Sequence, residues 1–108
     1  MTVRAGDLWV ADIAFTNGAA SKRRPILVLW IEGADAVVAA VTSAAPRSQS
    51  DVLLQEWAAA GLRVPSTVRL ARLDCLEQSL LRHPLGTLSN ADAIQVREVW
   101  DRCIKPQF

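Results

Sequence analysis

Residues 22–31 read KRRPILVLWI, in which three cations and a proline lead into six consecutive apolar residues. The apolar run is too short to cross a membrane, and the polar turn that follows it at residues 32–35 favours a buried strand. Pro25 suits the first residue of a strand, where its missing N–H breaks no ladder bond. The stretch therefore predicts a strand that begins at a cluster of positive charge.

A second apolar run, residues 36–41, follows after only the short turn and ends in Thr42 and Ser43. So short a connection joins antiparallel neighbours, because a parallel return needs about a dozen residues or more. Folding the hairpin about its turn brings the Arg24 end of the first strand beside the end of the second. An arginine and two hydroxyl groups are therefore expected at one strand end, which is the candidate site.

The other apolar segments predict further short strands, at residues 8–13, 51–54, 67–76 and 80–88. The alternation of apolar and polar residues in the third of these slips between Leu70 and Leu73. A bulge or a sharp bend would explain the slip, and bulges are common beside active sites. The small, polar loop at residues 15–21 is expected to be mobile and to deliver the basic triplet.

Two helices are expected. Residues 56–60, EWAAA, predict a short helix that Gly61 ends. The sequence SNAD at residues 89–92 has capping-box spacing, with Ser89 as the cap and Asp92 reaching back. The C-terminal helix that it starts carries an apolar face at helical spacing, made of Ala93, Val96, Trp100 and Cys103, with Ile104 alongside.

Strands in short succession with one stubby and one longer helix favour a mainly β fold with some α structure (α+β). The expected architecture is a small, strongly curved antiparallel barrel with the C-terminal helix packed on it, in one domain over residues 1–108. Composition is that of a globular protein, with 51% hydrophobic and 21% charged residues. The net charge of +1 gives no global field for nucleic acid, so any basic surface must be local.

Several classes of function are disfavoured. The two cysteines, Cys75 and Cys103, lack zinc-ligand spacing, and the single histidine, His83, excludes a mechanism that needs two imidazoles. No metal site and no cofactor are predicted. The N-terminus has no apolar signal region, and no apolar run is long enough to span a bilayer. The chain is therefore expected to be soluble and cytoplasmic, with no membrane partner.

The chain resembles the PemK/MazF family of type II toxins. The resemblance rests on the order and spacing of five short motifs that together cover nearly the whole chain: GDLW at 6–9, KRRPILVL at 22–29, VTS at 41–43, GL and PSTVR within 61–69, and LGTLS at 85–89. It implies an SH3-like barrel, a homodimer, and a metal-independent endoribonuclease that cleaves single-stranded RNA at short sequences. It also implies a cognate antitoxin that silences the toxin, and DNA binding by the complex of the two.

The resemblance assigns site residues. The family's essential arginine falls on Arg24 and its active-site threonine on Thr42, with Ser43 adjacent; these three are the expected catalytic residues. Lys22, Arg23, Ser66 and Arg69 are the expected RNA contacts.

One position departs from the family pattern, because some relatives carry an acid two residues after the arginine of the later strand. Arg69 matches that arginine, but the acid position is Ala71 here. The general base is therefore open, with Asp12, Asp74, Glu77 and His83 as the candidates.

Two other functions remain open. A toxin of the same fold could act without catalysis by poisoning a partner such as a DNA topoisomerase, as the related CcdB-type proteins do. A degenerate relative could serve only as a module that binds RNA or its antitoxin. The pairing of Arg24 with Thr42 favours the ribonuclease, and Ala71 favours the alternatives.

Overall fold

The computed structural model describes residues 2–13 and 22–108. They form one antiparallel sheet in the order β4-β5-β3-β2-β1-β6. The predicted loop at 15–21 lies outside the described residues. The elements are β1 (Asp7–Ile13), β2 (Lys22–Glu32), β3 (Asp35–Thr42), β4 (Asp51–Leu53), β5 (Thr67–Glu77), the 3₁₀ turn η1 (Gln78–Leu80), β6 (Leu81–Thr87) and α1 (Asn90–Cys103).

The predicted hairpin is confirmed. Strands β2 and β3 pair antiparallel about a turn at Gly33 and Ala34, with Ile26 opposite Ala40. Strand β2 begins at Lys22, so the prediction that Pro25 opens the strand is wrong. The reason is that β1 continues to pair with the basic triplet, up to Lys22 opposite Ile13.

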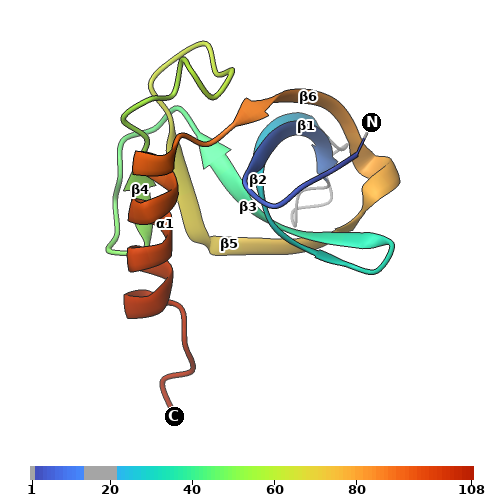
Figure 1. The fold of residues 1–108 in the computed structure, drawn as a ribbon. Coiled ribbons are helices and arrows are strands. Elements are labelled where there is room, and N and C mark those ends of the chain that lie inside the picture. Colours follow the sequence, from blue (N-terminus) through green and yellow to red (C-terminus); the bar gives the residue numbers. More distant parts are fainter. Residues whose placement is uncertain (1, 14–21) are drawn as a thin grey trace.

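The sheet curls strongly, with β1, β2 and β6 arching on one side and α1 standing beside β4 on the other (Figure 1). The curl is not a closed barrel, because the edge strands β4 and β6 are not paired. Instead, the turn that follows β4 meets β6: a Cβ on Gly61 would lie 2.0 Å from the carbonyl oxygen of Leu85. Backbone contact through two glycines, Gly61 and Gly86, therefore replaces strand pairing at this seam.

The two faces of the sheet bury separate clusters. The face toward α1, the helix-side core, includes Leu8, Leu27, Val41, Val68, Leu70, Val96 and Val99. The other face, the inner core, includes Trp9, Ala11, Ile26, Val28, Val38, Leu76 and Leu81. Strand β5 contributes to both because of the predicted bulge, which is confirmed: Ala39 pairs with Leu73, but its neighbour Ala40 pairs with Arg69.

The expected helix at 56–60 is absent; these residues form hydrogen-bonded turns. Ala60 N–H donates to the Glu56 carbonyl at 3.2 Å, and Gly61, at φ +89°, then turns the chain away. The backbone amides of Gln55 and Glu56 donate to a residue outside this segment. Each donates to a carboxyl oxygen of Asp92, at 2.9 Å.

Helix α1 begins as predicted, since Ser89 Oγ accepts a hydrogen bond from the Asp92 amide at 3.2 Å. The other half of the capping box is wrong, because the Asp92 carboxyl group accepts from Gln55 and Glu56 rather than reaching back to Ser89. Asp92 is buried, 1% exposed, and so fastens the first turn of α1 to the segment after β4.

Replacing Asp92 with asparagine is expected to lower the free energy of unfolding by about 1.5–3 kcal/mol. The amide keeps one acceptor oxygen, so one of the two backbone N–H groups loses its partner in a part-buried site. Urea unfolding of both proteins measures the difference. Asp101→Asn, an exposed position on the same helix, is the matched control. Equal midpoints for Asp92→Asn and wild type would show that this contact is unimportant for stability.

Within residues 2–13 and 22–108, no helix is long and apolar enough to cross a membrane.

Candidate functional site at the ends of β2 and β3

The register of the hairpin brings Arg24 and Thr42 together. Ile26 pairs with Ala40, so two residues further along each strand Arg24 falls opposite Thr42. Both residues belong to the lining of two hollows, one toward each core. The predicted gathering of an arginine and hydroxyl groups at one strand end is therefore present.

The larger hollow, called here the basic hollow, has a volume of about 510 Å³ and opens between the strand ends and the turn at 61–66. None of its lining residues in the described part of the chain is acidic. Most of its polar lining residues carry hydrogen-bond donors, which suits a polyanion. That polar lining comprises Lys22, Arg23, Arg24, Thr42, Ser43, Arg63, Ser66 and His83.

The smaller hollow, called here the inner hollow, measures about 260 Å³ and lies at the rim of the inner core. Its walls are mostly apolar, and it contains one carboxylate, Asp74. Arginines 24, 69 and 72 and the hydroxyl of Thr42 complete its polar lining; the apolar residues are Ile13, Pro25, Ile26, Val38, Ala40, Val41 and Leu73.

Arg69 forms an ion pair with Asp51 of the neighbouring strand β4. Its Nε lies 3.7 Å from Oδ1 of Asp51, whose side chain is only 3% exposed, and the other carboxyl oxygen accepts the Arg47 amide at 2.9 Å. The buried Nε makes no hydrogen bond among the described residues, so the contact is purely ionic. Asp51 thus holds the Arg69 side chain in place beside Arg24 in the lining of the inner hollow.

The hydroxyl groups differ in how they are engaged. Thr42 Oγ1 accepts the Ala44 amide at 3.2 Å, which leaves its own proton available to a ligand. Ser66 is buried and donates to the Val64 carbonyl at 2.7 Å, so its proton is occupied in a turn. Ser43 is exposed at the mouth of the basic hollow. Thr42 and Ser43 are therefore better placed than Ser66 to donate to a bound anion.

Arg23 is paired with an acid. Its Nε lies 3.4 Å from Asp12 Oδ1, and Arg82 Nε donates to the other oxygen at 2.6 Å. The hydrogen bond from Arg82, aided by the positive charges of both arginines, holds the pKa of Asp12 below its ordinary value of 3.8. Asp12 is therefore a carboxylate engaged with two cations, which weakens it as a candidate base.

This pairing has a pH signature. A carboxyl group whose pKa is lower in the folded state stabilises that state above its unfolded pKa, and the contribution is lost as the pH falls through the folded pKa. The difference in unfolding midpoint between wild type and Asp12→Asn is therefore expected to be present at pH 6 and to shrink below about pH 4. Urea unfolding across this range measures it. A difference that is constant with pH would exclude the pairing as its source.

Sequence reasoning missed one member of the basic hollow and undervalued another. Arg63 lies in the turn at 61–66, and His83 lies in β6 opposite Val10 of β1. Neither carries a local motif, because Arg63 reaches the hollow through the contact between Gly61 and Gly86, and His83 through the pairing of β6 with β1. The useful signal was the pair of glycines, which marks a close backbone approach.

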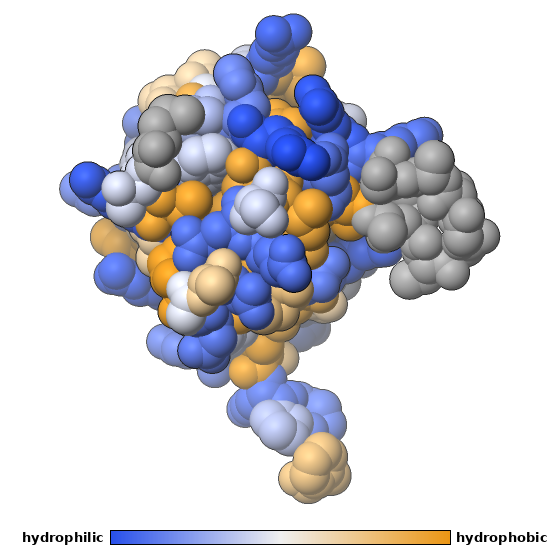
Figure 2. All heavy atoms as spheres, turned by 90° about the vertical axis from the view of Figure 1, so that its right-hand side faces the viewer, coloured by the Kyte–Doolittle hydropathy of each residue, from blue (hydrophilic) through white to orange (hydrophobic). Residues whose placement is uncertain are grey.

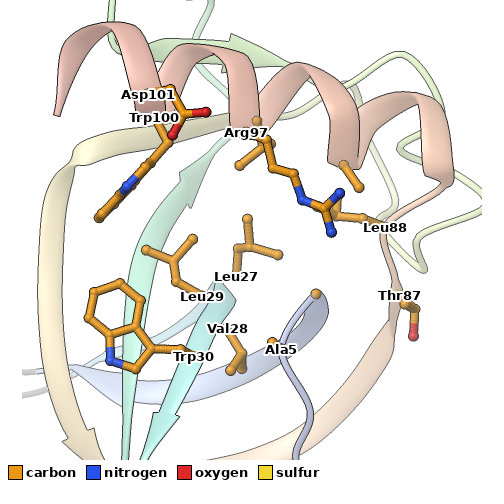
Figure 3. A pocket seen from close by; sticks show the side chains of 13 residues that line it. Ala5, Leu27, Val28, Leu29, Trp30, Thr87, Leu88, Arg97, Trp100 and Asp101 are labelled. Carbon is orange, nitrogen blue, oxygen red and sulfur yellow. The ribbon is translucent and has the colours of Figure 1, made fainter.

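A third hollow, about 380 Å³, lies under α1 and includes neither Arg24 nor Thr42 (Figure 3). Leu27 and Leu29 of β2 point toward the helix, and Trp30 meets Trp100 edge to face, with ring centroids 5.8 Å apart. Trp30 remains 40% exposed.

On the face shown in Figure 2, hydrophobic and hydrophilic side chains are interspersed.

The family model of the PemK-like, MazF-like toxins of type II toxin–antitoxin systems matches residues 4–102. The chain therefore belongs to this family, as the sequence motifs predicted. None of the curated proteins matches the sequence significantly.

Solved structures share the fold. One is an endoribonuclease in complex with its cognate antitoxin from a mycobacterial species, with a TM-score of 0.77 and 14% identity, covering 95% of each chain. Mycobacterium tuberculosis toxin MazF-mt6 has a TM-score of 0.73 and 21% identity over 89% of this chain and 93% of that one. MazF from Deinococcus radiodurans has a TM-score of 0.71 and 24% identity over 94% and 96%.

Proposed function

We propose that the chain, as one domain over residues 1–108, is a sequence-specific endoribonuclease toxin that cleaves single-stranded RNA without a metal ion and so inhibits growth. It acts in the cytoplasm as a homodimer, is neutralised by a cognate antitoxin, and binds DNA only together with it. The observation that carries the proposal is the position of Arg24 and Thr42 between two hollows, one of which has no acidic lining residue among those described. Family membership and relatives solved as toxin–antitoxin complexes support it.

The proposed reaction uses the 2′-hydroxyl of the substrate as nucleophile. The 2′ oxygen gives its proton to a general base and bonds to the adjacent phosphorus while the bond from phosphorus to the 5′ oxygen breaks. The 5′ oxygen takes up a proton, which leaves a cyclic phosphate and a 5′-hydroxyl end. Arg24 stabilises the negative charge that develops on the phosphoryl oxygens, because its guanidinium stays ionised and its fork fits two of them. Thr42 and Ser43 donate further hydrogen bonds, and Lys22, Arg23, Ser66 and Arg69 contact the RNA.

Two of the four candidate general bases fit the site. Ala71 lies in the bulge of β5 where some relatives carry an acid, Asp12 is engaged by two arginines, and Glu77 lines neither hollow. This leaves Asp74, in the inner hollow, and His83, in the basic hollow. Help from a general base is typically worth about 10²–10⁴ in rate.

The decisive experiment incubates the purified protein with a long RNA in the presence of EDTA. Discrete fragments with 5′-hydroxyl ends support the proposed reaction, and addition of the antitoxin should stop their formation. A requirement for added divalent metal would contradict the metal-independent mechanism.

A second candidate function is favoured by Ala71 alone: a toxin of the same fold that binds and poisons a partner such as a topoisomerase without cutting RNA. Growth arrest on expression, with RNA that stays intact in the purified assay, would select this alternative.

A further inference from the structure

The two hollows that meet at Arg24 and Thr42 have different chemistry. The basic hollow offers four lysine or arginine side chains and one histidine, and no carboxylate among its described lining residues. The inner hollow has seven apolar lining residues, and its polar lining includes one carboxylate and three arginines. A phosphodiester therefore suits the basic hollow, whereas the carboxylate of Asp74 repels a phosphodiester from the inner hollow. Of the two hollows, the inner one combines apolar walls with a strong hydrogen-bond acceptor, Asp74, and strong donors, the arginines.

We infer that the inner hollow is a base-recognition pocket, and that it selects a nucleobase bearing both an amino group and a carbonyl oxygen, namely cytosine or guanine. This inference rests on the proposed function. Asp74 accepts from the amino group, and arginine donates to the carbonyl oxygen and adjacent ring nitrogen, as these side chains do at base edges elsewhere. Adenine lacks the carbonyl group and uracil lacks the amino group, so each leaves one polar partner in the pocket unpaired.

The geometry of the pocket supports a base rather than a larger ligand. Its volume of about 260 Å³ equals that of roughly nine water molecules at ~30 Å³ each. Asp74 pairs in register with Val38, a buried residue of the inner core, so it belongs to the same face of the sheet as Ile26 and Arg24. The Asp74 Oδ1 atom accepts the Cys75 amide at 2.9 Å, which fixes the carboxylate and leaves Oδ2 for a ligand.

The arrangement also gives the path of the strand. The scissile phosphate lies at Arg24, which alone among the described cations lines both hollows. The base on one side of that phosphate enters the inner hollow, where Asp51 holds Arg69 from behind. The backbone on the other side continues across the basic hollow, past Arg63 and His83. In this arrangement the protein recognises the nucleobase on one face of the sheet and contacts the phosphate groups on the other.

The test of the pocket cleaves a randomised RNA with wild type and Asp74→Asn and sequences the fragment ends. Wild type is expected to enrich cytosine or guanine over uracil and adenine by about 5- to 150-fold at one position beside the cut. The fragments that Asp74→Asn still produces, and its binding to uncleavable RNA, should lose most of this enrichment and admit uracil, whose carbonyl can accept from the new amide. Glu98→Gln, an exposed position on α1, is the matched control and should keep the wild-type preference. Unchanged preference in Asp74→Asn would overturn the inference.

A companion measurement separates charge from base identity. Arg63→Ala should weaken binding of all sequences by a similar factor and reduce the slope of log K against log salt by about 0.7, as expected for one lost contact to a single strand. Arg102→Ala, on the exposed side of α1, should change neither quantity. A change of base preference in Arg63→Ala would contradict the division between the two hollows.

Binding to short 2′-O-methyl RNA, which cannot be cleaved, keeps the inference separate from the proposed function. If wild type cuts no RNA but binds cytosine- or guanine-containing oligonucleotides in preference to the others, and Asp74→Asn loses that preference, the nuclease proposal fails and the pocket stands. If wild type cleaves RNA with no preference for these bases at the cut, the nuclease proposal stands and the pocket fails.

Discussion

Alanine in place of Arg24 is expected to reduce the rate of RNA cleavage by roughly 10²–10³, the usual cost of removing one preorganised donor to a developing negative charge. The residue lies at the strand end opposite Thr42 and is the one described cation that lines both hollows. The fold should survive, because Arg24 is exposed and contributes to neither core. Initial rates on a defined RNA, with elution volume and urea midpoint as checks on folding, measure the effect.

Two further variants sharpen this result. Arg24→Lys keeps the charge but loses the planar fork, so its rate should fall between those of wild type and Arg24→Ala. Arg102→Ala, a surface arginine of α1, should cleave as wild type does. A purified Arg24→Ala protein that cuts RNA at the wild-type rate would remove Arg24 from the mechanism.

The second large effect is on stability. Gly61→Ala is expected to destabilise the protein by more than about 4 kcal/mol, a loss that is exceptional for a single substitution. The residue has φ +89°, which disfavours any side chain, and a Cβ would lie 2.0 Å from the Leu85 carbonyl oxygen. The contact is between backbones, so no side chain can move aside.

The chain offers controls that separate these two costs. Gly6 has nearly the same backbone angle, φ +92°, but open space around it, so Gly6→Ala should cost only about 1–2 kcal/mol. Gly86→Ala has no positive φ but places its Cβ 2.5 Å from the Ala60 carbonyl oxygen, and so reports the clash alone. Urea unfolding orders the three variants. A Gly61→Ala protein as stable as Gly6→Ala would show that the seam between the turn and β6 is easily relaxed.

Much of the fold could be predicted because it depends on local pattern. Two apolar runs around Gly33 define the hairpin, Ser89 defines the start of α1, and the slip between Leu70 and Leu73 marks the bulge. The meeting of Arg24 with Thr42 followed from the same hairpin. These features need only the period of two in a strand and the chemistry of caps.

What could not be predicted depends on contacts between distant residues. The Asp92 carboxyl group binds amides 36 and 37 residues earlier, and this replaced both the expected capping box and the expected helix at 56–60. Arg63 reaches the basic hollow only because Gly61 abuts β6. The open seam between β4 and β6 likewise depends on how a three-residue edge strand and a turn fill the space.

The bulge in β5 has an arithmetic consequence. Three residues, Leu70 to Arg72, stand between partners of the adjacent residues Ala39 and Ala40. Because three is odd, the strand changes sides: Leu70 belongs to the helix-side core and Leu76 to the inner core. Deleting or inserting one residue here would invert one half of the strand and turn Arg69 or Asp74 out of the inner hollow, whereas changes of two would keep both in place. Length variation at this point is therefore expected only in even steps.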